Sequence, residues 1–250
     1  MSRAVSLQAL PDYDPDRVRD TLSRLLAPLG GIGHFVKPGQ KVLIKPNLLA
    51  AKTPDKAVTT HPEIVRQAIL LAQGAGGKVT VGDSPGLGKA ANVARKCGIL
   101  DVVEETGARF ATFEESVPIT LDTGTFHHLE VAREALETDV IINLPKLKTH
   151  QMMGMTCAVK NMYGAVVGMR KISLHLQAGT SKERFACLLI ELAQHFAPVL
   201  NIVDAVTAME GNGPGSGDPI HVGALIGGPS CIAVDSVALE LSGLPKERVY

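Results

Sequence analysis

Polar side chains gather where the predicted buried strands of this 250-residue chain end. Lysines dominate these positions, and aspartates, asparagines, a serine and a histidine accompany them. The residues after the strands are Lys45, Asn47, Asp83, Ser84, Lys146, Lys148, His150 and Asp204, and a further polar stretch adds Lys160 and Asn161. Ligands of open α/β sheets bind beyond the carboxyl ends of the strands, so these side chains are candidates for a functional site.

Several lysines at one rim of a sheet repel each other unless an anion lies among them. We therefore expect a small anionic ligand, such as a phosphate or a carboxylate. Contacts to this ligand are expected from Lys45, Asn47, His61, Ser84, Lys160 and Asn161. His61 joins the group because it precedes Pro62 at a predicted helix start, and helix N-termini attract anions.

Catalysis is expected from Lys146, Lys148 and His150, which follow the third of these strands. The lysines would bind and polarise the anion, and His150 is the acid–base candidate because its ordinary pKa lies near neutrality. Asp83 and Asp204 would hold a divalent metal or orient the lysines. Replacing Lys146 or Lys148 by Met is expected to weaken anion binding and hardly to change stability.

Most of these positions also have a purely structural interpretation. Lys45 and Asn47 could shape a turn around Pro46, and Lys146 and Lys148 could be solvated loop charges. Asp235 has apolar neighbours in a helical pattern, so it is either a buried, paired carboxylate or an acid of the site.

Two glycine-rich segments lack the spacing of nucleotide-binding motifs. Residues 82–89 follow a strand and open a helix, but Gly88 comes one residue too late and Ala90 replaces the Ser or Thr of a phosphate loop. Residues 211–217 have no following helix, so they form either a flap over the site or a plain surface loop.

The four cysteines are far apart in the sequence, at Cys97, Cys157, Cys187 and Cys231. Neither a zinc nor an iron–sulfur spacing is present, so no iron–sulfur cluster is expected within residues 1–250. A catalytic thiol at Cys157 is disfavoured because the sequence places no base beside it.

Short apolar runs alternate with amphipathic segments and predict the elements that position these residues. Strands are expected at 41–44, 78–81, 139–143, 200–203 and 222–226, with shorter ones at 109–113, 117–121 and 126–131. Helices are expected at 15–29, 62–72, 88–97, 181–196 and 231–242. The pattern predicts an α/β fold with a mainly parallel, doubly wound sheet and a small antiparallel excursion.

We expect one α/β domain over residues 1–250, and a C-terminal module beyond it because the chain stops soon after a helix. Lys plus Arg and Asp plus Glu number 25 each, so bulk charge gives no basis for nucleic-acid binding. No apolar run is long enough to span a bilayer, and the N-terminus lacks the apolar stretch of a signal peptide. These features predict a cytoplasmic protein with neither nucleic acid nor membrane as a partner.

The motifs KPN, THP, GDSPG, LPKLKTH and KNMYG occur in this order between residues 45 and 164. Together with 202–205 and 233–235 they resemble the family called domain of unknown function 362, often described as iron–sulfur cluster-binding proteins. The resemblance covers most of residues 40–245. It implies that a ferredoxin-like module with clustered cysteines, present in many members, would lie outside this domain.

The leading hypothesis is an enzyme domain that acts on a small anionic metabolite, with electrons from a ferredoxin or a ferredoxin-like module. Two alternatives stay open. One is a non-catalytic domain that binds a ligand or acts as a scaffold for an iron–sulfur cluster. The other is a metal-dependent transferase or hydrolase without redox chemistry. Turnover with reduced ferredoxin would separate an enzyme from a scaffold.

Overall fold

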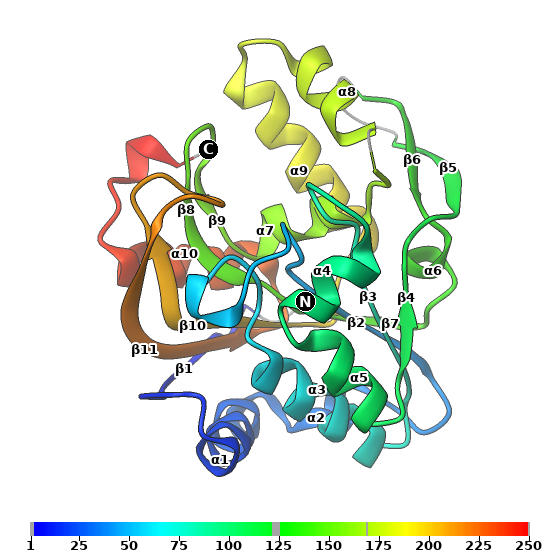
Figure 1. Ribbon diagram of the computed structural model, residues 1–250, viewed down its shortest axis with the longest axis vertical. Coiled ribbons are helices and arrows are strands. Elements are labelled where there is room, and N and C mark those ends of the chain that lie inside the picture. Colours follow the sequence, from blue (N-terminus) through cyan, green and yellow to red (C-terminus); the bar gives the residue numbers. More distant parts are fainter. Residues whose placement is uncertain (1–2, 122–125, 169, 250) are drawn as a thin grey trace.

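A large sheet organises the chain in the computed structural model, which describes residues 3–121, 126–168 and 170–249 (Figure 1). Its strand order is β1-β11-β10-β7-β2-β3-β4. Strands β10, β7, β2, β3 and β4 are parallel. At one edge β11 pairs antiparallel with β10, and β1 pairs antiparallel with β11. The bounds are β1 (Ser6–Ala9), β2 (Lys41–Pro46), β3 (Lys78–Gly82), β4 (Arg109–Ala111), β7 (Val140–Leu144), β10 (Leu200–Glu210) and β11 (Asp218–Gly228). The predicted α/β fold with a mainly parallel sheet is confirmed.

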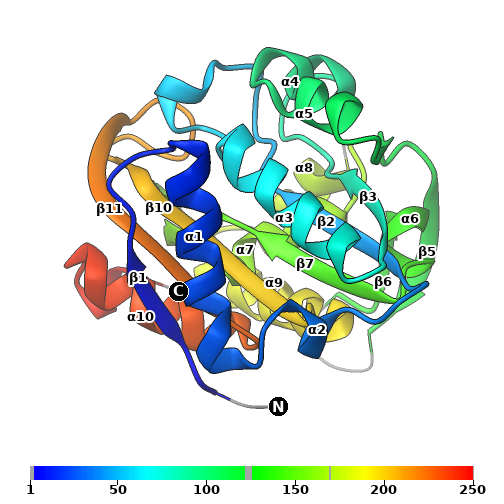
Figure 2. The ribbon, with the colours of Figure 1, turned by 90° about the horizontal axis from the view of Figure 1, so that it is seen from below.

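Helices cover both faces of this sheet (Figure 2). On one face lie α1 (Pro15–Leu26), α3 (Pro62–Gly74) and α5 (Ile99–Glu105), and on the other α7 (Ala158–Asn161), α9 (Lys182–Phe196) and α10 (Cys231–Ser242). Strand β2 shows why the strands are continuously apolar. Val42 and Ile44 pack into the core of the first face, and Leu43 packs into the core of the second.

Side chains cap two of the helices at their N-termini. Asp14 caps α1 by accepting a hydrogen bond from the Arg17 backbone N–H at 3.0 Å. His61 caps α3, where its Nδ1 accepts from the Glu63 backbone N–H at 3.2 Å. Both helices have proline at their first position, as expected for a residue without a backbone N–H.

The small antiparallel excursion is the pair β5 (Ser116–Thr120) and β6 (His128–Ala132). The expected strand at 109–113 does not belong to it, because β4 pairs in parallel with β3 at the edge of the main sheet. Residues 122–125 lie outside the described residues.

The segment after β7 is a strand, and not the loop with solvated lysines that the sequence also allowed. It forms strand β8 (Lys146–His150), which pairs with β10 and with the short β9 (Gly154–Thr156). Both Lys146 and Lys148 are therefore buried strand residues.

Several elements had no counterpart in the predicted pattern. They include helix α8 (Arg170–Ala178), which covers the carboxyl ends of the strands, and the short helices α2 (Ile32–Phe35) and α6 (Arg133–Leu136). Helix α4 (Ala90–Lys96), in contrast, lies within the helix expected at 88–97. Short 3-10 turns occur at Ala27–Leu29, Pro54–Lys56, Met162–Ala165 and Lys246–Arg248. Within the described ranges, no helix has both the length and the apolar character to cross a membrane.

Candidate functional site

A pocket of about 240 Å³ lies beyond the carboxyl ends of β2 and β3. Segments from β2, β3, β8, α7, α8 and the 211–217 loop surround it. Six predicted site residues line it, namely Asn47, Asp83, Ser84, His150, Lys160 and Asn161, and Lys171, Tyr163 and His175 join them. Parallel strands end at the same edge of a sheet, which is why residues distant in sequence meet here.

The Lys45–Asp83 ion pair is buried against one wall of the pocket. Lys45 Nζ lies 2.8 Å from Asp83 Oδ1 and also donates to the Asn161 carbonyl oxygen. Asp83 Oδ2 accepts from the Leu48 backbone N–H at 2.8 Å. Burial lowers the pKa of Lys45, and the Asp83 carboxylate opposes this effect. A Cβ at Gly164 would lie 1.9 Å from Asp83 Oδ1, so this pair requires glycine there.

Two lysines line the pocket without a carboxylate partner among the described residues. Lys171 Nζ donates to the carbonyl oxygens of Ser84 and Pro85, and Lys160 Nζ lies 5.9 Å from the centre of the Tyr163 ring. Burial lowers the pKa of both lysines to about 8. The pocket therefore carries positive charge that its own side chains do not balance.

Lys148 lies behind this pocket, fully buried. Its Nζ donates to Asn47 Oδ1 and to the Val58 carbonyl oxygen, each at 2.8 Å. Burial, and then the like charges of Lys160 and Lys146, hold its pKa well below the ordinary value. It reaches the pocket only through Asn47.

A chain of buried amides extends from Asn47 into the sheet. Asn47 Nδ2 donates to Asn161 Oδ1 at 2.9 Å, and Asn161 Nδ2 donates to Asn143 Oδ1 at 2.8 Å. Asn143 Nδ2 in turn donates to Asn201 Oδ1 at 2.9 Å. The hydrogen bonds fix the orientation of each amide and hold α7 against the strands. Asn143 and Asn201 were not predicted, although a polar residue inside an apolar strand was a usable signal.

His150 differs from the expected acid–base group of near-neutral pKa. Its Nδ1 accepts from the backbone N–H groups of Met152 and Met153 at 3.2 and 3.1 Å, which places the proton of the neutral ring on Nε2. Burial, followed by the charge of Lys160, lowers its pKa to about 3. His150 is therefore a neutral hydrogen-bond donor at physiological pH.

A second cluster contains three further predicted site residues, Lys146, Asp204 and His61, and does not line the pocket. Lys146 Nζ lies 2.9 Å from Asp204 Oδ2, and Tyr13 donates to Asp204 Oδ1 at 2.8 Å. The His61 backbone N–H donates to Asp204 Oδ2 at 2.9 Å, and its ring stacks on Tyr13. Replacing Lys146 by Met would leave the buried Asp204 carboxylate without its ammonium. The ion pair therefore leads us to expect that Lys146→Met lowers the free energy of unfolding, in place of the unchanged stability expected from the sequence.

The two expected metal ligands lie in different ion pairs. Each carboxylate faces a buried lysine, Lys45 for Asp83 and Lys146 for Asp204. In the part of the chain that the structure describes, no three His, Cys, Asp or Glu side chains are grouped to hold a metal ion. A divalent metal at these aspartates stays a prediction.

Asp235 has a structural role at the start of α7. Its oxygens accept from the backbone N–H groups of Ala158 and Val159 at 2.6 and 3.0 Å. Burial raises its pKa to about 6, and burial also raises the pKa of the neighbouring Cys157 thiol. A raised thiol pKa disfavours the reactive thiolate.

The 211–217 loop reaches the pocket through Pro214. Thr149 Oγ1 donates to the Gly211 carbonyl oxygen at 3.1 Å, and a Cβ at Gly213 would lie 2.2 Å from the Thr149 carbonyl oxygen. The loop therefore packs against β8 and covers one side of the site.

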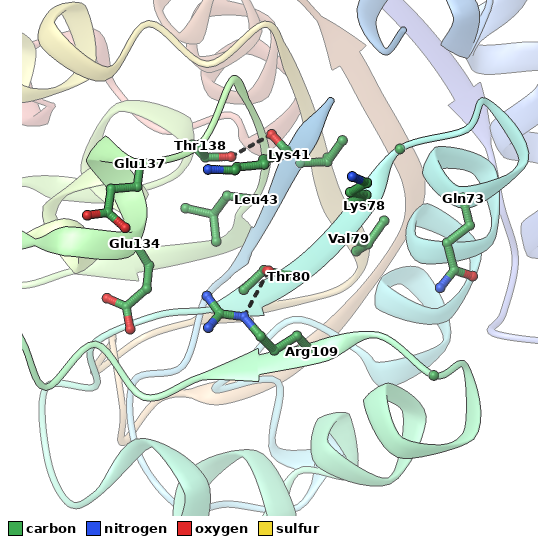
Figure 3. Close-up of a pocket in the computed structure, with 13 residues that line it drawn as sticks. Lys41, Leu43, Gln73, Lys78, Val79, Thr80, Arg109, Glu134, Glu137 and Thr138 are labelled. Atoms are coloured by element: carbon green, nitrogen blue, oxygen red, sulfur yellow. Dashed lines mark hydrogen bonds between the residues drawn. The ribbon is translucent and has the colours of Figure 1, made fainter. Parts of the chain in front are cut away.

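A larger pocket of about 520 Å³ lies at the opposite, amino ends of β2, β3 and β4 (Figure 3). Its cationic residues Lys41, Lys78 and Arg109 are exposed to water, and Arg109 Nε donates to Thr80 Oγ1 at 3.3 Å. Solvated charges need no ligand. The smaller pocket is the better candidate because its lysines are desolvated.

Comparison with known proteins confirms the family resemblance. The family model described as Domain of unknown function (DUF362) matches residues 42–240. The chain is 43% identical over 249 residues to thylakoid-associated protein sll1697 of Synechocystis sp. (strain ATCC 27184 / PCC 6803 / Kazusa), covering 96% of this chain and 75% of the relative.

Two solved structures share the fold. A Thermotoga maritima protein aligns with a TM-score of 0.58 and 14% identity, and the lactate racemase apoprotein of Thermoanaerobacterium thermosaccharolyticum with 0.54 and 16%. The alignments cover 95% and 93% of this chain. The chain spans only 61% and 56% of the lengths of those proteins.

Proposed function

This chain belongs to the DUF362 family, and we propose that it is an enzyme domain that binds a small anionic metabolite in the pocket beyond β2 and β3. The observation that carries the proposal is the charge balance of the pocket. Lys160 and Lys171 have no carboxylate partner among the described residues, and Asp83 is already paired with Lys45. A bound carboxylate or phosphate would supply the missing negative charge through charge-assisted hydrogen bonds.

The same residues suit proton transfer to or from the bound anion. Lys160 has a pKa of about 8, so both its charged and its neutral forms are accessible near physiological pH. Neutral His150 would donate its Nε2–H to an oxygen that gains charge. Lys171, held by two carbonyl oxygens, would anchor the anion. Lactate is a suitable carboxylate probe because one fold neighbour is named a lactate racemase.

Electron supply by a ferredoxin rests on the family resemblance alone and stays a hypothesis. It is tested by turnover of the full protein with reduced ferredoxin.

The proposal predicts opposite effects of pH on the free and the anion-bound protein. Sulfate should raise the melting temperature at pH 7, and this shift should shrink as pH rises from 8 to 9.5. Both lysines lose their proton in this range, whereas sulfate keeps its charge. Above pH 8, affinity should fall by about ten-fold per pH unit for each lysine that must be protonated. Thermal melting at several sulfate concentrations and pH values measures this effect.

The lysine contribution to the stability of the free protein has the opposite sign. The pKa of each lysine is about 8 in the folded protein and 10.5 ordinarily, so the unfolded chain binds more protons between these values. Stability from these two groups therefore rises with pH over this range. A sulfate shift that is absent at pH 7, or equally large at pH 7 and 9.5, would contradict the proposal.

A further inference from the structure

We infer that the anion bound in this pocket carries an apolar group, so that the ligand is an amphiphilic carboxylate or phosphate monoester. The inference rests on the proposed function, because it describes the apolar part of the ligand whose anionic part the proposed function describes. It comes from the contrast between the lysines of the pocket, Lys160 and Lys171, and the apolar side chains that line the same pocket.

Helix α8 places the two kinds of residue side by side. Lys171 is buried and donates to carbonyl oxygens of the β3 loop, whereas the next residue, Ile172, lines the same pocket and is 47% exposed. Leu176, one turn further along the helix, is 76% exposed. The Lys171 ammonium therefore points into the protein, whereas Ile172 lines the pocket and keeps part of its side chain exposed to solvent.

Apolar residues from two other segments line the same pocket. Leu49 belongs to the loop after β2, and Pro214 belongs to the 211–217 loop. Together with Ile172 of α8, they give the pocket apolar walls beside its lysines.

This arrangement orients the ligand. The anionic head would contact Lys160 and Lys171, and an alkyl or aryl chain would extend between Leu49 and Ile172 toward solvent. Small-molecule pockets combine apolar walls with a few polar groups that fix orientation, and clustered exposed apolar residues mark binding sites. Inorganic phosphate would use the lysines and leave the apolar walls uncovered.

A chain-length series tests the inference. We expect calorimetry of the wild-type protein with acetate, butyrate, hexanoate and octanoate to show affinity rising by about three- to four-fold per methylene until the chain leaves the mouth. Ile172→Ser should flatten this rise. Ile232→Ser is the matched control, because Ile232 is also a helical isoleucine, 53% exposed, and does not line this pocket. The affinity of Ile232→Ser should rise with chain length as steeply as that of the wild type.

The outcomes separate this inference from the proposed function. A flat series in a wild-type protein that still binds sulfate would overturn the inference and leave the anion site standing. No binding of sulfate or of any carboxylate would overturn the anion site itself. An equal loss of the rise in both serine variants would show that the effect is not specific to the pocket that Ile172 lines, and it would overturn the inference. An Ile172→Ser variant whose affinity rises with chain length as steeply as that of the wild type would also overturn the inference.

Discussion

Asp83→Asn is expected to lower the free energy of unfolding by about 3–5 kcal/mol. The substitution leaves Lys45 fully buried, with its ammonium facing a neutral amide instead of the carboxylate 2.8 Å away. The single asparagine oxygen can accept from the Leu48 backbone N–H or from Lys45 Nζ but not from both, so the loss combines the missing charge with one missing acceptor. Urea denaturation at pH 7, followed by circular dichroism, measures the change.

A matched control is Glu115→Gln, which removes a carboxylate from the exposed ion pair with Arg133 at 2.9 Å. An exposed pair contributes at most about 1 kcal/mol, so this variant should stay close to the wild type. The Asp83→Asn penalty should also shrink at pH 9.5, because an uncompensated buried lysine releases its proton more readily. Equal effects of the two substitutions would show that the Lys45–Asp83 pair does not stabilise the strand ends.

Lys160→Met and Lys171→Met are each expected to weaken sulfate binding by about ten-fold or more. Each removes one charge-assisted contact to the anion, and about 1.4 kcal/mol corresponds to a factor of ten. Methionine keeps most of the apolar stem. Isothermal titration calorimetry at pH 7 gives the affinities, and the double variant should bind no sulfate at millimolar concentration.

Lys52→Met is the control for general charge, because Lys52 is exposed and does not line the pocket. It should retain wild-type affinity. If all three substitutions weakened binding equally, sulfate would be responding to the net charge of the surface and not to a site.

Much of the fold could be predicted because β2, β3, β7 and β10 carry short apolar runs that only a doubly covered sheet can bury. The rule that ligands bind beyond the carboxyl ends of strands then placed Asn47, Asp83 and His150 at one pocket. The local pattern also placed His61 at a helix start, where it caps α3.

The pairing of the buried charges could not be predicted. Lys146 and Lys148 alternate with Leu147, which is a strand pattern, but lysines are rarely buried and a loop was the simpler interpretation. Tyr13 meets Asp204 across 191 positions of sequence, and no local pattern signals that contact. Lys171 was missed because α8 lies far from the strand ends in sequence and reaches them only in the folded chain.

The central claim is that the pocket beyond β2 and β3 is an anion site. The most direct measurement is the anomalous difference density of a crystal soaked in selenate at pH 7. The charge balance predicts a peak between the ammonium groups of Lys160 and Lys171, and loss of that peak in the double methionine variant. Selenate found only at the exposed cluster of Lys41, Lys78 and Arg109, with no density at the two lysines of the pocket, would contradict the claim.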